Sequence, residues 1–135
     1  HTAGYGVTAN ILGVGGNIDP HKKEGNIELS QNLQIATAAV DAAGLCLFVA
    51  FPVLDDADGV PTICEMLNAR FGLSLTPDDV VALGKQILND EKEFNRLAGF
   101  TKVHDQMPEM FKESFPPHDT TWDFSDDELA NTLNF

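Results

Sequence analysis

The stretch NIELSQNLQIATAAVDAAG, residues 26–44, decides the fold of this chain. Asn26 is a favourable residue for the cap before an α-helix, and Gly44 is favourable for the end of one. Between them, apolar residues recur at intervals of three and four positions, the spacing that places side chains on one helix face: Leu29, Leu33, Ala36 and Val40. The pattern therefore predicts a helix that begins at Ile27 and ends at Gly44.

Two more helices are predicted further along the chain. Residues 61–71 begin with a proline and are followed by Gly72, and their inward-facing residues are expected to be Ile63, Met66, Leu67 and Phe71. The sequence TPDD, residues 76–79, combines a capping threonine, a proline at the first helical position and two acids in the first turn. The apolar side of the helix that follows comprises Val80, Leu83, Ile87, Phe94 and Leu97.

The remaining segments carry weaker signals. Residues 47–54 are apolar and are compatible with either a buried extended segment or a continued helix. After Gly99 the sequence is irregular until Ser125, which caps a short last helix. No segment shows the alternation of a half-buried strand. We therefore predict a mostly all-α fold, an irregular helical domain that comprises residues 1–135 as one unit.

Composition excludes several classes of partner. The 135 residues carry a net charge of −13, which repels nucleic acid and anionic membrane surfaces. No apolar run is long enough to cross a bilayer. The chain begins at His1 without a methionine or a signal pattern, so we expect a piece of a longer protein. Two cysteines that fit no zinc spacing favour reduced thiols and a cytoplasmic location.

The stretch DAAGLCLF, residues 41–48, allows two interpretations. In the first, Gly44 simply ends the helix and Cys46 packs as a small buried hydrophobic residue. In the second, Asp41 and Cys46 face a cofactor. Asp41 lies at the negative end of the helix dipole, which costs about 0.3–1 kcal/mol unless a partner compensates it. Such a locally unfavourable residue is expected at a functional site.

Several segments in register resemble the tungsten-containing aldehyde ferredoxin oxidoreductases. DAAGLCLF is similar to the D-x-x-G-L-C motif of that family. The segment that follows residue 90 is similar to a second signature at Glu91, Phe94, Asn95, Gly99, Phe100, Thr101, Asp105, Pro108 and Phe111. The opening HTAGYGVTANIL and the ending FSDDELANTLNF are similar to further parts of the family. The resemblance implies the C-terminal domain of such an enzyme.

The resemblance also implies roles for individual residues. Cys46 would be the fourth thiolate ligand of a [4Fe–4S] cluster, whose other three cysteines would lie upstream of this chain. Asp41 would accept hydrogen bonds from a tungsten (or molybdenum) bis-molybdopterin cofactor, and Leu45 and Cys46 would contact the same pterin through their backbones. His1 would correspond to an active-site histidine that donates a proton or orients the substrate.

The implied reaction is the oxidation of an aldehyde by water to a carboxylic acid, with two electrons passing to ferredoxin. Some relatives instead act on aromatic-ring thioesters, so an aryl-CoA reductase-type enzyme is one alternative. A non-catalytic helical interaction domain with an inert Cys46 is the other. The implied partners are ferredoxin, a small aldehyde, the upstream domains and a second copy in a homodimer. The chain alone is expected to bind no cofactor and to be inactive.

Overall fold

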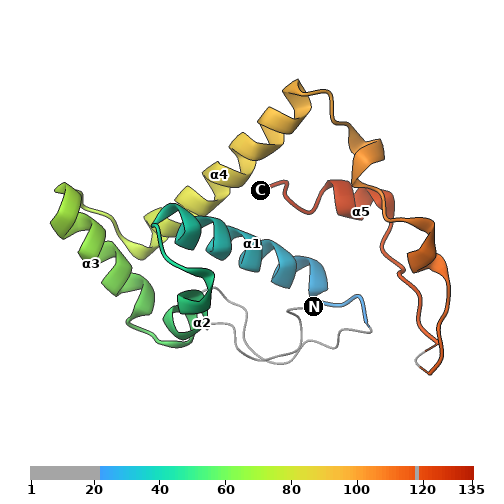
Figure 1. Ribbon diagram of the computed structural model, residues 1–135, viewed down its shortest axis with the longest axis horizontal. Helices are drawn as coiled ribbons and strands as arrows, with labels where there is room; N and C mark the ends of the chain where they lie inside the picture. Colours follow the sequence, from blue (N-terminus) through green and yellow to red (C-terminus); the bar gives the residue numbers. More distant parts are fainter. Residues whose placement is uncertain (1–21, 118) are drawn as a thin grey trace.

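The computed structural model describes residues 22–117 and 119–135, and these residues are predominantly helical. Their elements are α1 (Asn26–Ala42), α2 (Leu47–Asp55), α3 (Gly59–Phe71), α4 (Pro77–Leu97), η2 (Lys102–Asp105), η3 (Glu109–Lys112) and α5 (Asp126–Ala130). Within the same residues the only extended pairing is an isolated bridge between Phe115 and Thr120. The prediction of a mostly all-α fold is confirmed (Figure 1). No described helix is long and apolar enough to cross a membrane.

The ends of the two longest described helices follow local signals in the sequence. Gly44 has φ 76°, and its N–H donates to the Asp41 carbonyl at 2.9 Å while the N–H of Leu45 donates to the Val40 carbonyl at 3.2 Å. This pair of bonds is a Schellman motif, which ends α1 as predicted. At the start of α4, the Asp79 carboxylate accepts a hydrogen bond from the Thr76 N–H at 2.8 Å, as expected for a capping box.

The predicted cap of α1 was wrong by one residue. Gly25 occupies the N-cap position with φ 76°, and Asn26 is the first residue of the helix. The side-chain amide of Asn26 donates to the Lys22 carbonyl at 2.6 Å, so it ties the helix to the preceding turn. Residues 47–54 lie in α2, so the segment is helical, but the turn at Gly44 separates it from α1.

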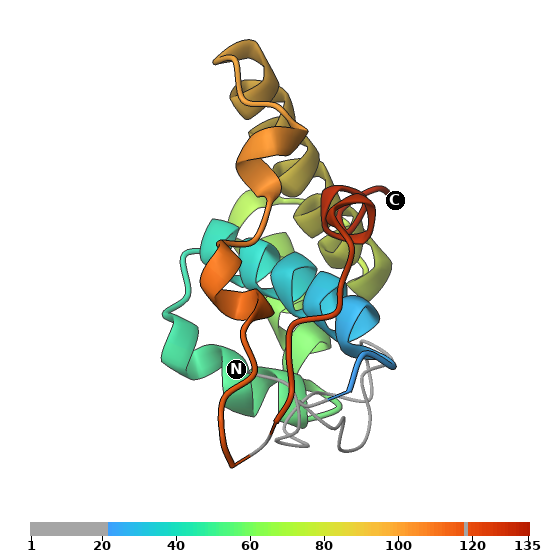
Figure 2. The ribbon, with the colours of Figure 1, turned by 90° about the vertical axis from the view of Figure 1, so that its right-hand side faces the viewer.

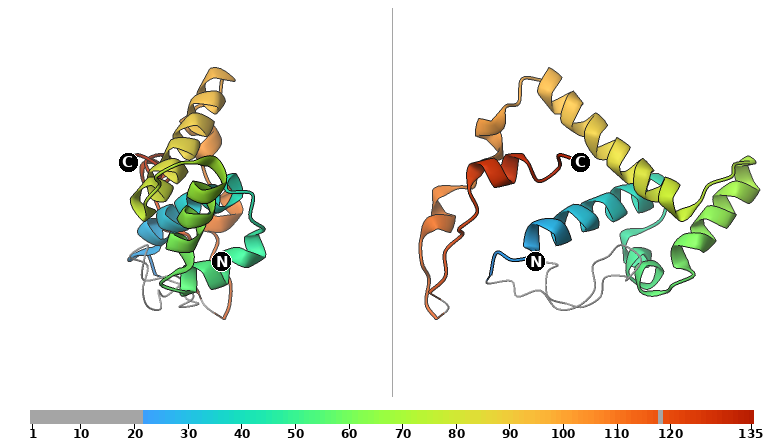
Figure 3. Two further views of the ribbon diagram at one scale, coloured as in Figure 1. Left: turned by 90° about the vertical axis from the view of Figure 1, so that its left-hand side faces the viewer. Right: turned by 180° about the vertical axis from the view of Figure 1, so that it is seen from behind.

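The core lies where four helices meet. Ala36 of α1 packs with Val60 of α3, and Val53 of α2 and Val80 of α4 pack against this pair. The main helix pairing is that of α1 with α4, which lie together where α1 ends and α4 begins and diverge from there (Figures 1 and 3). No described side chain is less than 2% exposed, so the core between the helices is small and incompletely covered.

Burial along α3 and α4 differs from the sequence prediction. The buried residues of α4 are Gly84 and Leu88, whereas Phe94 and Leu97 are exposed. The second half of α4 projects beyond α1, so its apolar stripe has no helix to pack against (Figure 2). On α3, Ile63 is buried as predicted, but Met66 and Phe71 are exposed.

The C-terminal segment returns to the helices and is held by side chains of α1 and α4. The Gln31 amide of α1 donates to the Thr132 carbonyl, and Lys92 of α4 donates to the Leu133 carbonyl at 3.1 Å. Ser125 caps α5, as predicted, through a capping box with Glu128. The C-terminus therefore lies between α1 and α4 (Figure 3).

Candidate functional site

The candidate site is the junction between α1 and α2, which holds Asp41, Leu45 and Cys46. Asp41 lies in the last turn of α1, and Cys46 is the N-cap residue of α2. Because the Schellman motif at Gly44 reverses the chain, only four residues separate the two helices. The sequence thus places a carboxylate and a thiol on either side of one rigid turn.

The two candidate side chains of this junction, those of Asp41 and Cys46, are exposed to solvent. The interpretation of Cys46 as a small buried hydrophobic residue was therefore wrong. Cys46 begins α2, and its carbonyl accepts a hydrogen bond from the Val49 N–H at 2.8 Å. An anionic sulfur at the N-terminal end of a helix interacts favourably with the helix dipole, so this position suits a thiolate ligand.

Cys64, unlike Cys46, is buried. It lies on the inner face of α3 and is 3% exposed. Burial, and secondarily the negative charge of Asp79, raises the pKa of the Cys64 thiol. A buried thiol with a raised pKa is rarely ionised near neutrality, and the thiolate is the form that binds metal. Cys46 is therefore the better of the two described candidates for a ligand.

The surface next to Cys46 is apolar. Leu47, Phe48 and Val49 follow it in α2, and Phe48 is 84% exposed. This exposed face was not predictable from the sequence, because an apolar run by itself predicts burial. An exposed apolar surface of this kind marks a contact with another part of a protein or with a ligand.

Neither Asp41 nor Cys46 lines the larger hollows of the described chain. One, of about 600 Å³, lies between the start of α1 and the aromatic side chains of the C-terminal segment, which include Phe111 and Trp122. The other, of about 720 Å³, lies between α1, α3 and α4 and is mostly apolar. The α1–α2 junction is an open face, so a group bound there would need further protein to cover it.

The described residues supply only part of a metal site. Residues 22–117 and 119–135 contain no group of three or more His, Cys, Asp or Glu side chains that could together hold a metal ion. The donor set that the junction offers is one exposed thiol and one exposed carboxylate. The thiol fits an iron–sulfur cluster as one of its ligands, and the carboxylate fits a pterin as one hydrogen-bond acceptor. Other residues must complete both sites. His1 lies outside the described residues.

Comparisons with known proteins show which family this chain resembles. Residues 1–131 match the family model described as aldehyde ferredoxin oxidoreductase, domains 2 and 3. The chain is 34% identical over 119 residues to the tungsten-containing aldehyde ferredoxin oxidoreductases of Pyrococcus horikoshii and Pyrococcus furiosus, and 33% identical to that of Thermococcus kodakarensis. Each match covers 87% of this chain but only 19% of the relative. No solved structure matches the chain.

Proposed function

The chain belongs to the aldehyde ferredoxin oxidoreductase family, and we propose that its α1–α2 junction contributes to the cofactor site of an enzyme that oxidises aldehydes to carboxylic acids. The observation that carries the proposal is the joint exposure of Asp41 and Cys46 on the two sides of the Gly44 turn. The chain spans about a fifth of the curated relatives that it matches, so the activity belongs to the full-length parent protein.

Cys46 provides one thiolate ligand to a [4Fe–4S] cluster, whose other ligands come from the rest of the parent chain. Its position before α2 leaves the sulfur accessible, and the Gly44 turn holds its backbone in place. Thiolates are the ligands that iron–sulfur clusters require. Cys64 is not a ligand of the cluster, because its side chain is buried on the inner face of α3.

Asp41 holds the pterin end of the cofactor. An ionised carboxylate only accepts hydrogen bonds, so it suits the N–H groups of a pterin ring. Leu45 and Cys46 lie next to it and contact the same ring through their backbones. This arrangement also explains an acid at the negative end of α1, because bound donors compensate the unfavourable dipole interaction.

The overall reaction converts an aldehyde and water into a carboxylic acid, two electrons and two protons. The tungsten bis-molybdopterin group supplies the two-electron chemistry when bound, and the curated relatives carry tungsten in their names. The protein groups orient the substrate and move protons, and we assign His1 to one of these tasks. A cluster held in part by Cys46 would supply the electron transfer towards ferredoxin.

The test is to measure iron and tungsten in the full-length parent, purified without oxygen, as wild type and as Cys46→Ser. We expect the variant to lose iron. Cys64→Ser is the matched control, since it removes the other thiol of the same chain and should keep the metal content of the wild type. Asp41→Ala should lower tungsten while leaving iron bound.

Unchanged iron in Cys46→Ser, with folding confirmed by circular dichroism, would refute the role of Cys46. In that case the non-catalytic interaction domain is the better description of this chain. Activity towards an aromatic-ring thioester with no aldehyde oxidation would instead favour the aryl-CoA reductase-type alternative.

A further inference from the structure

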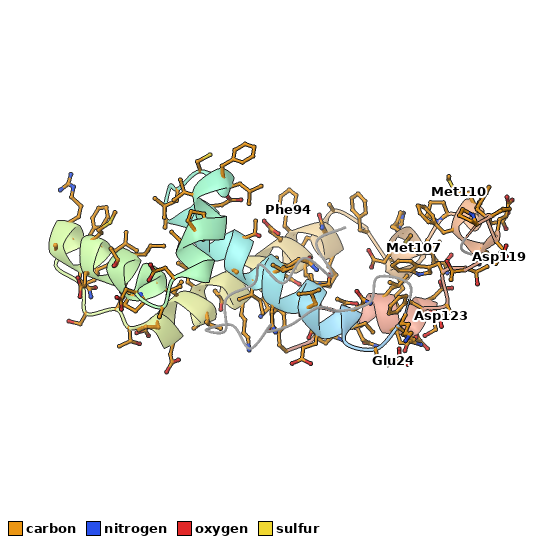
Figure 4. All side chains as sticks on the ribbon, turned by 90° about the horizontal axis from the view of Figure 1, so that it is seen from below. Glu24, Phe94, Met107, Met110, Asp119 and Asp123 are labelled. Atoms are coloured by element: carbon orange, nitrogen blue, oxygen red, sulfur yellow. The ribbon has the colours of Figure 1, made fainter. Side chains whose placement is uncertain are left out.

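The helix that begins at Cys46 has few contacts that fix its direction. In its first turn, Leu47, Phe48 and Val49 are all exposed, and among the described side chains of α2 only that of Ala50 is buried. The helix projects to one side of α1 and α3 (Figures 2 and 4). Each contact that α2 does make therefore carries much of the work of orienting it.

Pro52 also weakens α2 from within. It lies inside the helix and has no N–H to donate to the carbonyl of Phe48, four residues earlier. A helix that lacks one of its backbone bonds depends more on its neighbours to hold a single direction. Those neighbours are the Gly44 turn at the start of α2 and the first residues of α3 at its end.

The end of α2 lies directly against the start of α3. A Cβ atom added to Gly59 of α3 would meet the carbonyl oxygen of Val53 and would lie 2.8 Å from its carbonyl carbon and 2.9 Å from its Cα. These are backbone atoms, so they cannot turn aside as a flexible side chain can. Gly59 has no positive φ, so the close approach alone requires glycine there. Carbon atoms pack best at about 3.5–4.0 Å, so a methyl group would force the two helices apart by roughly 1 Å.

A side-chain hydrogen bond shapes the link between the two helices. Only residues 56–58 lie between them. The Asp56 carboxylate accepts a hydrogen bond from the Asp58 N–H at 2.8 Å, and the Asp56 carbonyl accepts one from the Gly59 N–H at 3.1 Å. An aspartate that bonds to the backbone two residues later stabilises a tight turn. The link therefore holds Gly59 in its contact with Val53.

We propose that Gly59 is a positioning residue for the Cys46 ligand, because its missing side chain sets the direction in which α2 presents the thiolate. Val53 and Cys46 are about two helical turns apart, or roughly 10 Å, so a shift of one end of α2 moves the other. A functional site tolerates errors of about 0.5 Å, which is less than the displacement that a methyl group at Gly59 would cause. This role rests on the proposed function of Cys46 as a cluster ligand.

The experiment compares Gly59→Ala with wild type in the full-length parent, purified without oxygen. We expect the variant to retain iron, but to shift both the electron paramagnetic resonance spectrum and the midpoint potential of the reduced cluster, since both respond to the surroundings of the ligands. Iron should also be lost to a chelator roughly tenfold faster or more, the scale on which changes around a metal ligand act.

A second pair of variants tests the same contact without overpacking it. Asp56→Ala removes the acceptor for the Asp58 N–H, so it should shift the spectrum and the potential even where Gly59→Ala does not fold. Asp56→Asn removes the same charge but retains an acceptor oxygen, so it should behave as wild type. A shift in Asp56→Asn as large as that in Asp56→Ala would show that the charge matters and the turn does not.

Gly72→Ala is the matched control, at the opposite end of α3. Gly72 has φ +68°, and nothing lies within 4 Å of a Cβ atom added there, so alanine strains the end of α3 without displacing α2. Its spectrum and potential should equal those of wild type. An equal shift in Gly72→Ala, or an unchanged spectrum and potential in folded Gly59→Ala, would overturn the positioning role.

Cys46→Ser, measured in parallel, separates this role from the proposed function. Loss of iron from Cys46→Ser beside unchanged cluster properties in Gly59→Ala would refute the positioning role alone. Retention of iron in Cys46→Ser would refute the ligand, and the positioning role of Gly59 would fall with it.

Discussion

Gly84 of α4 lies directly against Ile35 of α1. A Cβ atom added to Gly84 would meet the Ile35 carbonyl oxygen and would lie 2.9 Å from the Cγ2 atom of the same residue. Both residues are buried. Carbon atoms pack best at about 3.5–4.0 Å, so there is no room for a methyl group at this point. The crossing of the two longest described helices therefore depends on the absence of a side chain at Gly84.

We expect Gly84→Ala to destabilise the chain by up to about 2 kcal/mol, because overpacking costs about 1–3 kcal/mol and the better helix propensity of alanine offsets about 1 kcal/mol of it. Alanine is a better helix former than glycine by about 1 kcal/mol, so a net loss would show that the contact outweighs helix propensity. Urea unfolding followed by circular dichroism measures the difference. Ala82→Gly, at an exposed position of the same helix, controls for propensity alone. An increase in stability on Gly84→Ala would mean that the helices do not touch there.

Gly44 presents the opposite situation, because its constraint is conformational. Nothing lies within 4 Å of a Cβ atom added there, but φ is +76°. A residue with a side chain is less stable in this left-handed region by about 1–2 kcal/mol. We expect Gly44→Ala to lower the free energy of unfolding by that amount and Gly44→Asn to lower it less, since asparagine tolerates this conformation. Equal stability of Gly44→Ala and wild type in urea would contradict the turn described here.

The parts of the fold that were predictable from sequence are those with a local cause. The end of α1 follows from Gly44, and the start of α4 follows from Thr76 and Asp79. In both cases a few adjacent residues satisfy the backbone groups that a helix end leaves unpaired. The N-cap of α1 was misplaced because glycine and asparagine stand side by side and both suit that position.

Burial could not be predicted in the same way, because it depends on which partner an apolar face meets. In the stripe predicted on α4, Leu83, Phe94 and Leu97 are exposed, and the buried residues of the helix are instead Gly84 and Leu88. The stripe gave no sign that α4 would diverge from α1 (Figure 1). The two cysteines illustrate the same limit: both lie in apolar sequence, yet Cys46 is exposed and Cys64 is buried. The roles proposed for Asp41 and Cys46 came from the family resemblance, since one acid and one thiol specify no chemistry.

The ion pair between Lys23 and Glu128 predicts a pH dependence of stability. Lys23 Nζ lies 2.6 Å from Glu128 Oε2 and joins the segment before α1 to α5. The hydrogen bond from Lys23, followed by those from Ser125, lowers the pKa of Glu128 from 4.5 to about 2. Because the folded pKa is the lower one, the stabilisation is complete above the ordinary glutamate pKa and is lost as the pH falls from 4.5 towards 2.

We therefore expect Glu128→Gln to be less stable than wild type at neutral pH and to approach wild-type stability near pH 2. Urea unfolding at a series of pH values measures this convergence. Glu109→Gln, which removes an exposed carboxylate of η3, controls for the change in net charge. A stability difference between Glu128→Gln and wild type that stays constant down to the lowest pH would show that the ion pair does not stabilise the fold.

The two thiols should react differently with an alkylating reagent, and the difference separates the fold from the proposed cofactor role. In the chain alone, Cys46 is exposed and should react with iodoacetamide, whereas burial and the raised pKa of Cys64 should protect that thiol until the chain unfolds. In the full-length parent with its metals, Cys46 should become protected as well, and removal of iron should restore its reaction but not that of Cys64. Mass spectrometry of the modified peptides distinguishes the two sites. Reaction of Cys64 before Cys46 in the chain would contradict the packing of α3, whereas rapid reaction of Cys46 in the metal-loaded parent would contradict only its role as a ligand.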